Sequence, residues 1–333
     1  MQQRQLGKNG PQISALGIGA MSFSNFYGPV SEQESHAVLN VALEEGVTHI
    51  DTANVYGMGV SEQSIGSFLK KQGPQGQDMF SIATKAAIAS KPDGTRYFDN
   101  TPEHLESELD KSLQRMGVER VDLFYVHRRD ADTPIEEVTE TLAALVKKGK
   151  IGGFGYSEIA PTSLYRAQAV HPVMAVQSEY SLSVRSPEMG LVQATKALGV
   201  ALVAFSPVGR SLLTDDPHTA ARVADMPWMR ENPRFIEPEL SRNVEAAADF
   251  RQLAADMGTT AAGLAIAWLL HKDEHIIPIP GTRSATRFRE LCAGANLKLT
   301  TAEMATIESV LPVGWAHGDR YSVGQWVGPE KYC

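Results

Sequence analysis

The heptapeptide VDLFYVH at residues 121–127 is an apolar run that ends on a polar side chain. Two earlier runs, VTHID at residues 47–51 and MFSIATK at residues 79–85, end in the same way. Each run is short, rich in β-branched or aromatic residues and separated from the next by a helix-like stretch, which predicts alternating strands and helices. Because the carboxyl ends of the strands of a parallel barrel meet at one mouth, the polar residues that close these runs are expected to share one cavity.

The same alternation continues along the whole chain. Strands are expected at residues 16–19, 47–51, 80–84, 121–126, 151–156, 173–177, 201–205 and 275–279. Helices are expected to begin near Ser31, Ser61, Thr101, Thr133, Ala160, Ser186, Ser241 and Ser284, several with a capping hydroxyl and an acid soon after it. Eight strands and eight helices without a Gly/Ser-rich or Pro-rich linker predict one α/β domain over residues 1–333, a single (β/α)8 TIM barrel.

Two segments add to this barrel. Residues 4–13 carry Asn9-Gly10 between two strand-like pieces and predict an N-terminal β-hairpin. Residues 206–240 form the longest irregular stretch, expected as an extended loop on the C-terminal face, either a lid or binding loop or a surface insertion packed by its own aromatic residues. An open doubly wound sheet is the rival fold, but residues 16–21 (LGIGAM) lack the third glycine of the dinucleotide fingerprint and do not open a helix.

The composition is typical of a soluble globular protein, with 43% hydrophobic and 21% charged residues. A formal net charge of −8 disfavours nucleic acid or an anionic membrane as partner, so a small-molecule substrate is expected. Two cysteines supply no disulfide framework, residues 1–10 lack an apolar signal core, and the apolar residues 261–270 are too few to span a bilayer. A cytoplasmic protein is therefore expected, with its oligomeric state open.

The polar residues that follow the three runs are Asp51, Tyr56, Lys85 and His127. A phenol has a pKa of about 10, and an ammonium group near Tyr56 would lower that pKa by favouring phenolate. Asp51 would keep Lys85 charged and oriented, and His127 could donate a hydrogen bond to a carbonyl oxygen or relay a proton. This set suits carbonyl reduction by a nicotinamide, and no metal is expected because Lys and Tyr are poor zinc ligands.

Each of these four residues also has a purely structural explanation. Asp51 could cap a turn, Tyr56 could be packing, Lys85 could extend its ammonium group from a strand end, and His127 could be a hydrogen-bonded core histidine. Together they favour a site. Two other functions stay open, a Schiff-base aldolase in which Lys85 attacks a carbonyl and a nucleotide-sensing regulatory protein.

In these motifs the chain resembles the aldo-keto reductase superfamily, particularly its longer bacterial and fungal members. The matching segments follow in order through nearly the whole chain, at residues 16–21, 51–57, 84–85, 122–127, 149–158, 177–180, 205–207 and 277–283. The resemblance implies reduction of aldehydes or ketones with NADP(H), with NAD(H) as a weaker alternative and an alcohol or sugar dehydrogenase as the reverse reaction. It implies Tyr56 as general acid/base, Lys85 and Asp51 as its tuning pair, and His127 as the group that orients the carbonyl.

The resemblance also implies that the cofactor binds extended across the barrel mouth without a Rossmann fold. The implied cofactor-binding residues are Gly19, Met21, Asp51, Ser157, Gln177, Phe205, Ser206, Pro207, Gly209, Arg210, Gly281, Thr282, Arg283, Arg287 and Glu290. Within this set Ser157 and Gln177 match positions that hold the nicotinamide carboxamide, and Phe205 matches an aromatic residue that stacks under the ring. The expected substrate-binding residues are Phe23, Phe26, Tyr27 and Trp228, whereas Trp315 is expected in the core.

The residues themselves support an anion site after the eighth strand. Residues 281–287 open a helix there, and a helix N-terminus favours an anion. Arg283 and Arg287, four apart, are expected on one helical face that clamps a 2′-phosphate, with a solvated basic face as the alternative. Three positions depart from the family pattern, namely Phe205 for tyrosine, Ser211 for glycine and Leu291 for asparagine. Arg128 and Arg129 make the mouth more cationic than the four polar residues require.

Overall fold

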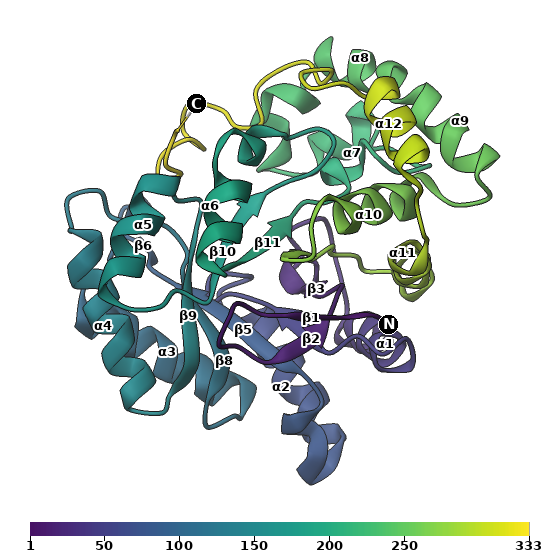
Figure 1. The fold of residues 1–333 in the computed structure, drawn as a ribbon. Helices are drawn as coiled ribbons and strands as arrows, with labels where there is room; N and C mark the ends of the chain where they lie inside the picture. Colours follow the sequence, from purple (N-terminus) through teal and green to yellow (C-terminus); the bar gives the residue numbers. More distant parts are fainter. Residues whose placement is uncertain (333) are drawn as a thin grey trace.

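Eight parallel strands form the central sheet of the protein, whose computed structural model describes residues 1–332 (Figure 1). The strands are β3 (Ile18–Gly19), β4 (His49–Asp51), β5 (Ser81–Ala86), β8 (Val121–Val126), β9 (Ile151–Ser157), β10 (Ala175–Glu179), β11 (Ala201–Phe205) and β12 (Ile276–Pro278). Each pairs in parallel with its neighbour in this order. The eight predicted strands are confirmed, and so is the parallel arrangement that brings their carboxyl ends to one mouth.

Backbone hydrogen bonds join the two end strands and close the barrel. The amide of Gly17 donates to the carbonyl of Pro278 at 3.0 Å, and that of Gly19 donates to Pro280 at 2.9 Å. Both acceptors are prolines, which have no amide hydrogen to donate in return. A β-carbon on Gly19 would lie 2.6 Å from the carbonyl oxygen of Ile279, so this seam requires a residue without a side chain. The (β/α)8 barrel that the strand count predicts is the observed fold.

Helices surround the barrel (Figure 1). They are α1 (Glu32–Glu44), α2 (Val60–Lys71), α3 (Pro102–Met116), α4 (Ile135–Lys147), α5 (Pro161–Val170), α6 (Leu191–Leu198), α10 (Ala261–Lys272) and α11 (Ala285–Asn296), followed by α12 (Thr301–Val310). The helix starts predicted at Ser31, Thr101 and Ser284 are confirmed. Each of these side chains caps its helix by accepting a hydrogen bond from the backbone amide three residues further along.

One of the expected helix starts is wrong. Ser186 opens the 3-10 helix η3 (Ser186–Met189), and α6 begins only after Gly190, whose φ of 133° interrupts the helix. The helix expected near Ser241 is α8 (Glu239–Ala246), which begins two residues earlier, so Ser241 lies in its first turn and is not its cap. An antiparallel hairpin of β6 (Ile88–Ser90) and β7 (Arg96–Phe98), which the sequence analysis did not anticipate, follows β5 at the mouth.

Of the two alternatives for residues 206–240, the structure supports the surface insertion, although most of its buried residues are aliphatic residues and methionines rather than aromatic residues. This segment holds the short helices η4 (Gly209–Ser211), α7 (Ala220–Ala224), η5 (Met229–Glu231) and η6 (Pro233–Phe235), and α8 and α9 (Ala248–Asp256) follow it. Its apolar side chains form a cluster of their own, made of Leu212, Val223, Met226, Met229, Phe235 and Leu240. The segment is therefore an insertion with its own small core, which a search for long periodic helices misses.

The predicted N-terminal hairpin is confirmed and closes the far end of the barrel. Strands β1 (Gln3–Gln5) and β2 (Gln12–Ser14) pair antiparallel, and Leu6 and Ile13 join the interior cluster with side chains such as Leu123 and Val203. Within residues 1–332 no single helix has the length and apolarity to cross a membrane. One pair, Glu239–Asp256 with Ala261–Lys272, does so only when taken together, and it bends by 87°.

Candidate active site

The four predicted polar residues meet at the mouth. Asp51 ends β4, Lys85 lies near the end of β5, and His127 follows β8, so the parallel register brings three neighbouring strand ends together. The Lys85 ammonium group, fully buried, donates to the Asp51 carboxylate, to the carbonyl of Thr52 at 2.7 Å and to the Tyr56 phenol at 3.4 Å. The Tyr56 and His127 rings meet edge to face with centroids 5.8 Å apart.

The second oxygen of Asp51 is also engaged. Gln177, in the middle of β10 on the other side of the barrel, donates to it from Nε2 at 2.7 Å. The Tyr125 ring lies in the barrel interior 5.8 Å from the Lys85 nitrogen and closes the cavity beneath it. We refer to Asp51, Tyr56, Lys85 and Gln177 as the Lys85 cluster. Every donor of its ammonium group and both oxygens of its carboxylate have partners, so its geometry is fixed.

The electrostatics of the Lys85 cluster differ in one respect from the sequence-based expectation. Burial acts to lower the pKa of Lys85, but Asp51 and Tyr56 outweigh it, so that pKa lies above its ordinary value and the lysine is cationic. Removal from water raises the pKa of the Tyr56 phenol, and the opposing effect of Lys85 offsets only part of that increase. The expected contribution of Lys85 is therefore present, but the net pKa shift of the phenol is upward.

His127 is a neutral imidazole in this site. Burial, reinforced by the positive charges of Arg128, Lys85 and Arg96, holds the pKa of His127 well below its usual range. Its Nδ1 is buried without a hydrogen-bond partner among residues 1–332. A neutral imidazole can donate a hydrogen bond from its one N–H group. It lacks the second ring proton that an imidazolium would release as an acid.

Two loops, which follow the carboxyl ends of β11 and β12, have backbone features that suit the phosphate groups of a ligand. After β11, Gly209, Arg210 and Ser211 have φ values of 58°, 53° and 90°, three consecutive residues in the left-handed region of which only one is glycine. Such backbone is costly and is typical of ligand-binding loops. The Gly209 amide already donates to the carbonyl of Ser206 at 2.9 Å. After β12, α11 begins with Ser284 as its cap, and phosphate sites of barrel proteins are frequently built from these same two loops.

The expectation that Arg283 and Arg287 share a helical face is wrong. Arg283 precedes the cap residue and donates to the carbonyl of Pro29 at 2.7 Å, whereas Arg287 lies in the first turn of α11 and pairs with Asp216 at 2.9 Å. Arg287 is exposed, so its guanidinium group can turn toward a ligand. The two arginines therefore flank the start of α11 from different sides.

The remaining predicted cofactor residues lie around the mouth. Gly19, Met21, Ser157, Phe205, Ser206 and Pro207 are at the ends of β3, β9 and β11 or just after them, and Gly281, Thr282 and Glu290 are before or in α11. The side chain of Arg210 does not point to a phosphate position. It is buried and pairs with Glu179 at 2.8 Å, which leaves only its backbone amide for the loop after β11.

Three of the four aromatic residues predicted to bind substrate, Phe26, Tyr27 and Trp228, form a group that we call the aromatic wall, and the fourth, Phe23, does not belong to it. Phe26 contacts Tyr27 and Trp228 with ring centroids 5.0 and 5.8 Å apart, and Tyr321 packs edge to face on Trp228 at 5.9 Å. Phe23 is instead 1% exposed within the main core, so the structure does not place it on the cleft. Sequence reasoning missed Tyr321, because nothing in the pattern near residue 321 links it to residues 26–27 and 228.

A second buried set of charges lies at the same mouth, and the sequence analysis missed it. Glu158 follows β9 and Glu179 ends β10; Arg320 of the C-terminal segment pairs with both, and Arg210 pairs with Glu179. We refer to these four residues as the Arg320 cluster. The two glutamates are 3% exposed, and Arg320 lowers the pKa of Glu158 against the opposing effect of burial. Acids at two strand ends were the available signal, but their shared partner Arg320 lies 162 residues after Glu158 and 141 residues after Glu179.

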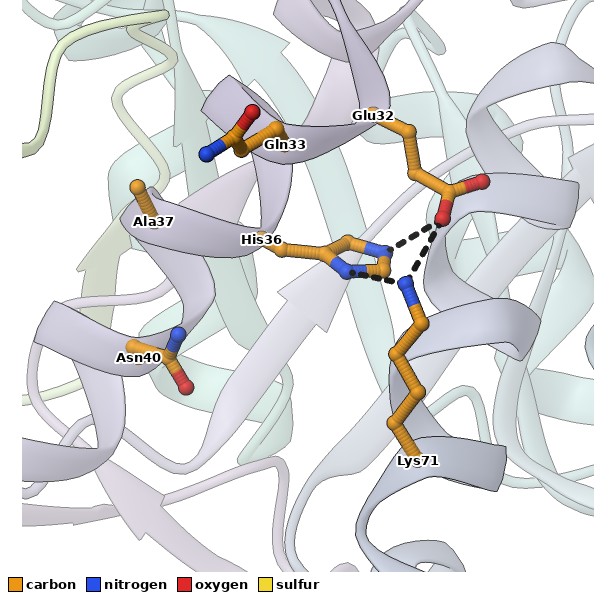
Figure 2. Close-up of a pocket in the computed structure, with 6 residues that line it drawn as sticks. All are labelled: Glu32, Gln33, His36, Ala37, Asn40 and Lys71. Carbon is orange, nitrogen blue, oxygen red and sulfur yellow. Dashed lines mark hydrogen bonds and ion pairs between the residues drawn. The ribbon is translucent and has the colours of Figure 1, made fainter.

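A surface pocket between α1 and α2 lies outside this site (Figure 2). Glu32, His36 and Lys71 contact one another there, with Lys71 Nζ 2.9 Å from Glu32 and 3.3 Å from the His36 ring. The His36 ring packs on Phe68 at the interface of the two helices. The contacts are those of a helix–helix interface, and no residue of the mouth lines the pocket.

A closed (β/α)8 barrel whose mouth holds a buried lysine and aspartate beside a half-buried tyrosine defines the class of this protein. A family model described as the aldo/keto reductase family matches residues 15–312, and the chain belongs to this family. Aldo-keto reductase yakc of Schizosaccharomyces pombe, which carries NADP(+) in its name, is 34% identical over 325 residues and covers 96% of this chain and 94% of that protein. Probable aldo-keto reductase 1 of Glycine max is 35% identical over 325 residues, covering 97% and 93%.

Solved structures agree on the fold. The glycerol dehydrogenase AKR11B4 of Gluconobacter oxydans superposes with a TM-score of 0.81 at 24% identity, covering 93% of this chain and 94% of that one. The holo form of aldo-keto reductase AKR11C1 of Bacillus halodurans gives 0.76, also at 24% identity, covering 93% and 96%. The predicted family and barrel are thereby confirmed.

Proposed function

We propose that this protein is an NADP(H)-dependent oxidoreductase that reduces aldehyde or ketone carbonyls to alcohols. The observation that carries the proposal is the Tyr56 phenol, 3.4 Å from a buried ammonium group that Asp51 and Thr52 hold in place, with the neutral His127 ring beside it. This is the arrangement needed to protonate a carbonyl oxygen. Expected alongside this function are a small carbonyl or alcohol substrate and a cytoplasmic location.

The residues at the mouth fit a nicotinamide dinucleotide. The left-handed backbone of residues 209–211 and the start of α11 suit its phosphates, Arg287 suits a 2′-phosphate, and the partly exposed Phe205 suits stacking against a ring. NADP(+) in the name of the Schizosaccharomyces pombe relative supports the phosphorylated form. When bound, the reduced cofactor supplies hydride to the carbonyl carbon.

Tyr56 then gives its phenolic proton to the carbonyl oxygen. The raised pKa of the phenol keeps it protonated near neutral pH, and the cationic Lys85 stabilises the phenolate that forms as the proton leaves. Asp51 balances the ammonium charge before and after the transfer. In the direction of alcohol oxidation the same phenolate takes the proton back.

His127 orients the substrate rather than donating its proton. Because its imidazole is neutral, a hydrogen bond from the ring can polarise the carbonyl without competing with Tyr56 for proton transfer. The edge-to-face contact of the His127 and Tyr56 rings supports a shared role at one carbonyl oxygen.

The aldolase alternative is disfavoured by Lys85 itself. A Schiff base needs a neutral amine, but the ammonium group has three hydrogen-bond acceptors and a raised pKa. A nucleotide-sensing role would keep the cofactor loops without any need for this proton-transfer set. Tight NADPH binding without turnover would favour that role.

The experiment that tests the proposed function is Tyr56→Phe, assayed by NADPH oxidation with a reactive aromatic aldehyde. Turnover is expected to fall by about 10²- to 10⁴-fold because only the proton donor is removed. NADPH affinity, measured by fluorescence titration, is expected to change little. Unchanged turnover would refute the role of Tyr56, and an inactive wild type with every carbonyl tested would refute the proposed function.

A further inference from the structure

Two arginines at the mouth lie outside the ion pairs of the described residues, although Arg128 contributes to the lowered pKa of Glu158, whose own partner is Arg320. Arg96 on β7 and Arg128 directly after His127 form no ion pair within residues 1–332, whereas the neighbouring Arg129 pairs with Glu330. Arg96 donates to the carbonyls of Gly324 and Val327 at 3.3 and 3.2 Å. Arg128 donates to the carbonyl of His127 at 2.6 Å and to the Ser157 hydroxyl at 3.0 Å. All of these partners are neutral.

Both guanidinium groups lie close to the proposed reaction centre. The charges of Arg128 and Arg96 each lower the pKa of His127, and that of Arg128 also acts on Tyr56. The two arginines also repel each other, because Arg128 is, after burial, a cause of the lowered pKa of Arg96. An anion next to both would relieve that repulsion.

The C-terminal segment, here residues 324–328, packs against these two side chains. Gly328 lies against Arg128, whose Cδ would be 3.1 Å from a β-carbon at that position, and against the ring of Phe98. The Phe98 ring centroid is 5.6 Å from the Arg96 guanidinium carbon. Phe98 and the C-terminal segment thus pack against both arginines.

The cofactor phosphates do not account for this charge. The loops that suit phosphate follow β11 and β12, and the strand order places β8 four positions from β12 and β5 five positions from it. In a closed eight-stranded barrel that is the opposite side of the mouth. Arg96 and Arg128 therefore lie on the His127 side of the mouth, away from the loops that suit phosphate.

We propose that Arg96 and Arg128 bind an oxyanion carried by the carbonyl substrate, so that the physiological substrate is an aldehyde or ketone with a carboxylate or phosphate group. Guanidinium groups bind both oxyanions with paired N–H donors. This inference rests on the proposed reductase function and adds its substrate class. The aromatic wall would then hold the carbon skeleton between the oxyanion and the carbonyl.

The test compares 4-carboxybenzaldehyde, 4-formylphenyl phosphate and neutral methyl 4-formylbenzoate with NADPH. We expect kcat/KM for one of the two charged aldehydes to exceed that of the ester by about tenfold or more, mainly through KM. The identity of the better charged aldehyde assigns the oxyanion. High salt should reduce the preference, since salt screens partly exposed charges.

Variants locate the effect. Arg96→Gln and Arg128→Gln are each expected to lower the ratio of charged to neutral kcat/KM by about ten- to a hundred-fold, as loss of a charge-assisted hydrogen bond does. Lys91→Gln, which removes an exposed cation from the same hairpin, is the matched control and should leave the ratio as it is. A readout without turnover is the rise in Tm that 4-(hydroxymethyl)benzoate causes in the NADP(+)-loaded protein, which Arg96→Gln should remove.

Two failures can be told apart. If the wild type reduces the neutral ester but shows no preference for either charged aldehyde, or if the preference survives both arginine substitutions, the oxyanion site is wrong and the reductase function stands. If no carbonyl compound is reduced although NADPH binds, the proposed function falls and this inference falls with it.

Discussion

The Lys85 cluster and the Arg320 cluster are two buried sets of charges at the same mouth, and they differ in what is left over after pairing. In the Arg320 cluster two carboxylates face two guanidinium groups, so the charges balance and no proton is available to transfer. In the Lys85 cluster one carboxylate balances one ammonium group, and a neutral phenol remains beside them. Pairing satisfies buried charge in both, but only the Lys85 cluster retains a group that can release a proton.

The largest effect is expected from Lys85→Met. Removing the ammonium group leaves the Asp51 carboxylate buried without its counter-ion, which costs about 3–5 kcal/mol of unfolding free energy. Turnover should fall at least as far as in Tyr56→Phe, because the phenolate loses its stabilising charge. Urea unfolding of Lys85→Met and of Lys85→Met/Asp51→Asn checks the assignment. The double variant should be the more stable of the two, and the reverse order would contradict a buried charge pair.

A smaller effect is expected from Arg320→Met. Glu158 loses its cation while Glu179 keeps Arg210, so the loss should lie near the lower end of that range, about 3 kcal/mol. The pH profile of turnover should not change, since no member of the Arg320 cluster exchanges a proton with substrate. Arg166→Gln is the exposed control; its bidentate pair with Glu136 lies in solvent, so its loss should change the unfolding free energy little. Equal losses in both variants would argue against the buried pairing.

The smallest effect is the pH dependence of His127. Its pKa in the folded protein is depressed, so the unfolded chain takes up a proton below a pH of about 6.5 while the folded protein does not. The stability that the neutral ring contributes is present above that pH and is lost as the pH falls. Between pH 7.5 and 5.5 the wild type should lose about 1 kcal/mol more than His127→Asn in urea unfolding. Parallel curves for the two proteins would show that His127 keeps an ordinary pKa.

Local patterns carried much of the sequence-based prediction. Apolar runs of five to seven residues that end on Asp51, Lys85 and His127 predicted both the strands and their shared mouth, because parallel register leaves few alternatives. The helix expected near Ser186 failed, because Gly190 interrupts the chain between η3 and α6 and a capping residue alone does not show where a helix continues. The placement of Arg283 and Arg287 failed because a four-residue spacing implies a shared face only if both residues are helical.

The sequence by itself determined the barrel, the family and the proposed proton-transfer residues, since each is written in short segments whose periodicity and closing side chains are local properties. Tertiary structure alone decided the partners of Glu158 and Glu179, the burial of Phe23 and, within the described residues, the neutral partners of Arg96 and Arg128. These depend on where the C-terminal segment and the β6–β7 hairpin fold back over the mouth. Contacts between residues more than a hundred positions apart leave no periodic trace in one sequence, because charge balance is a property of space rather than of order along the chain.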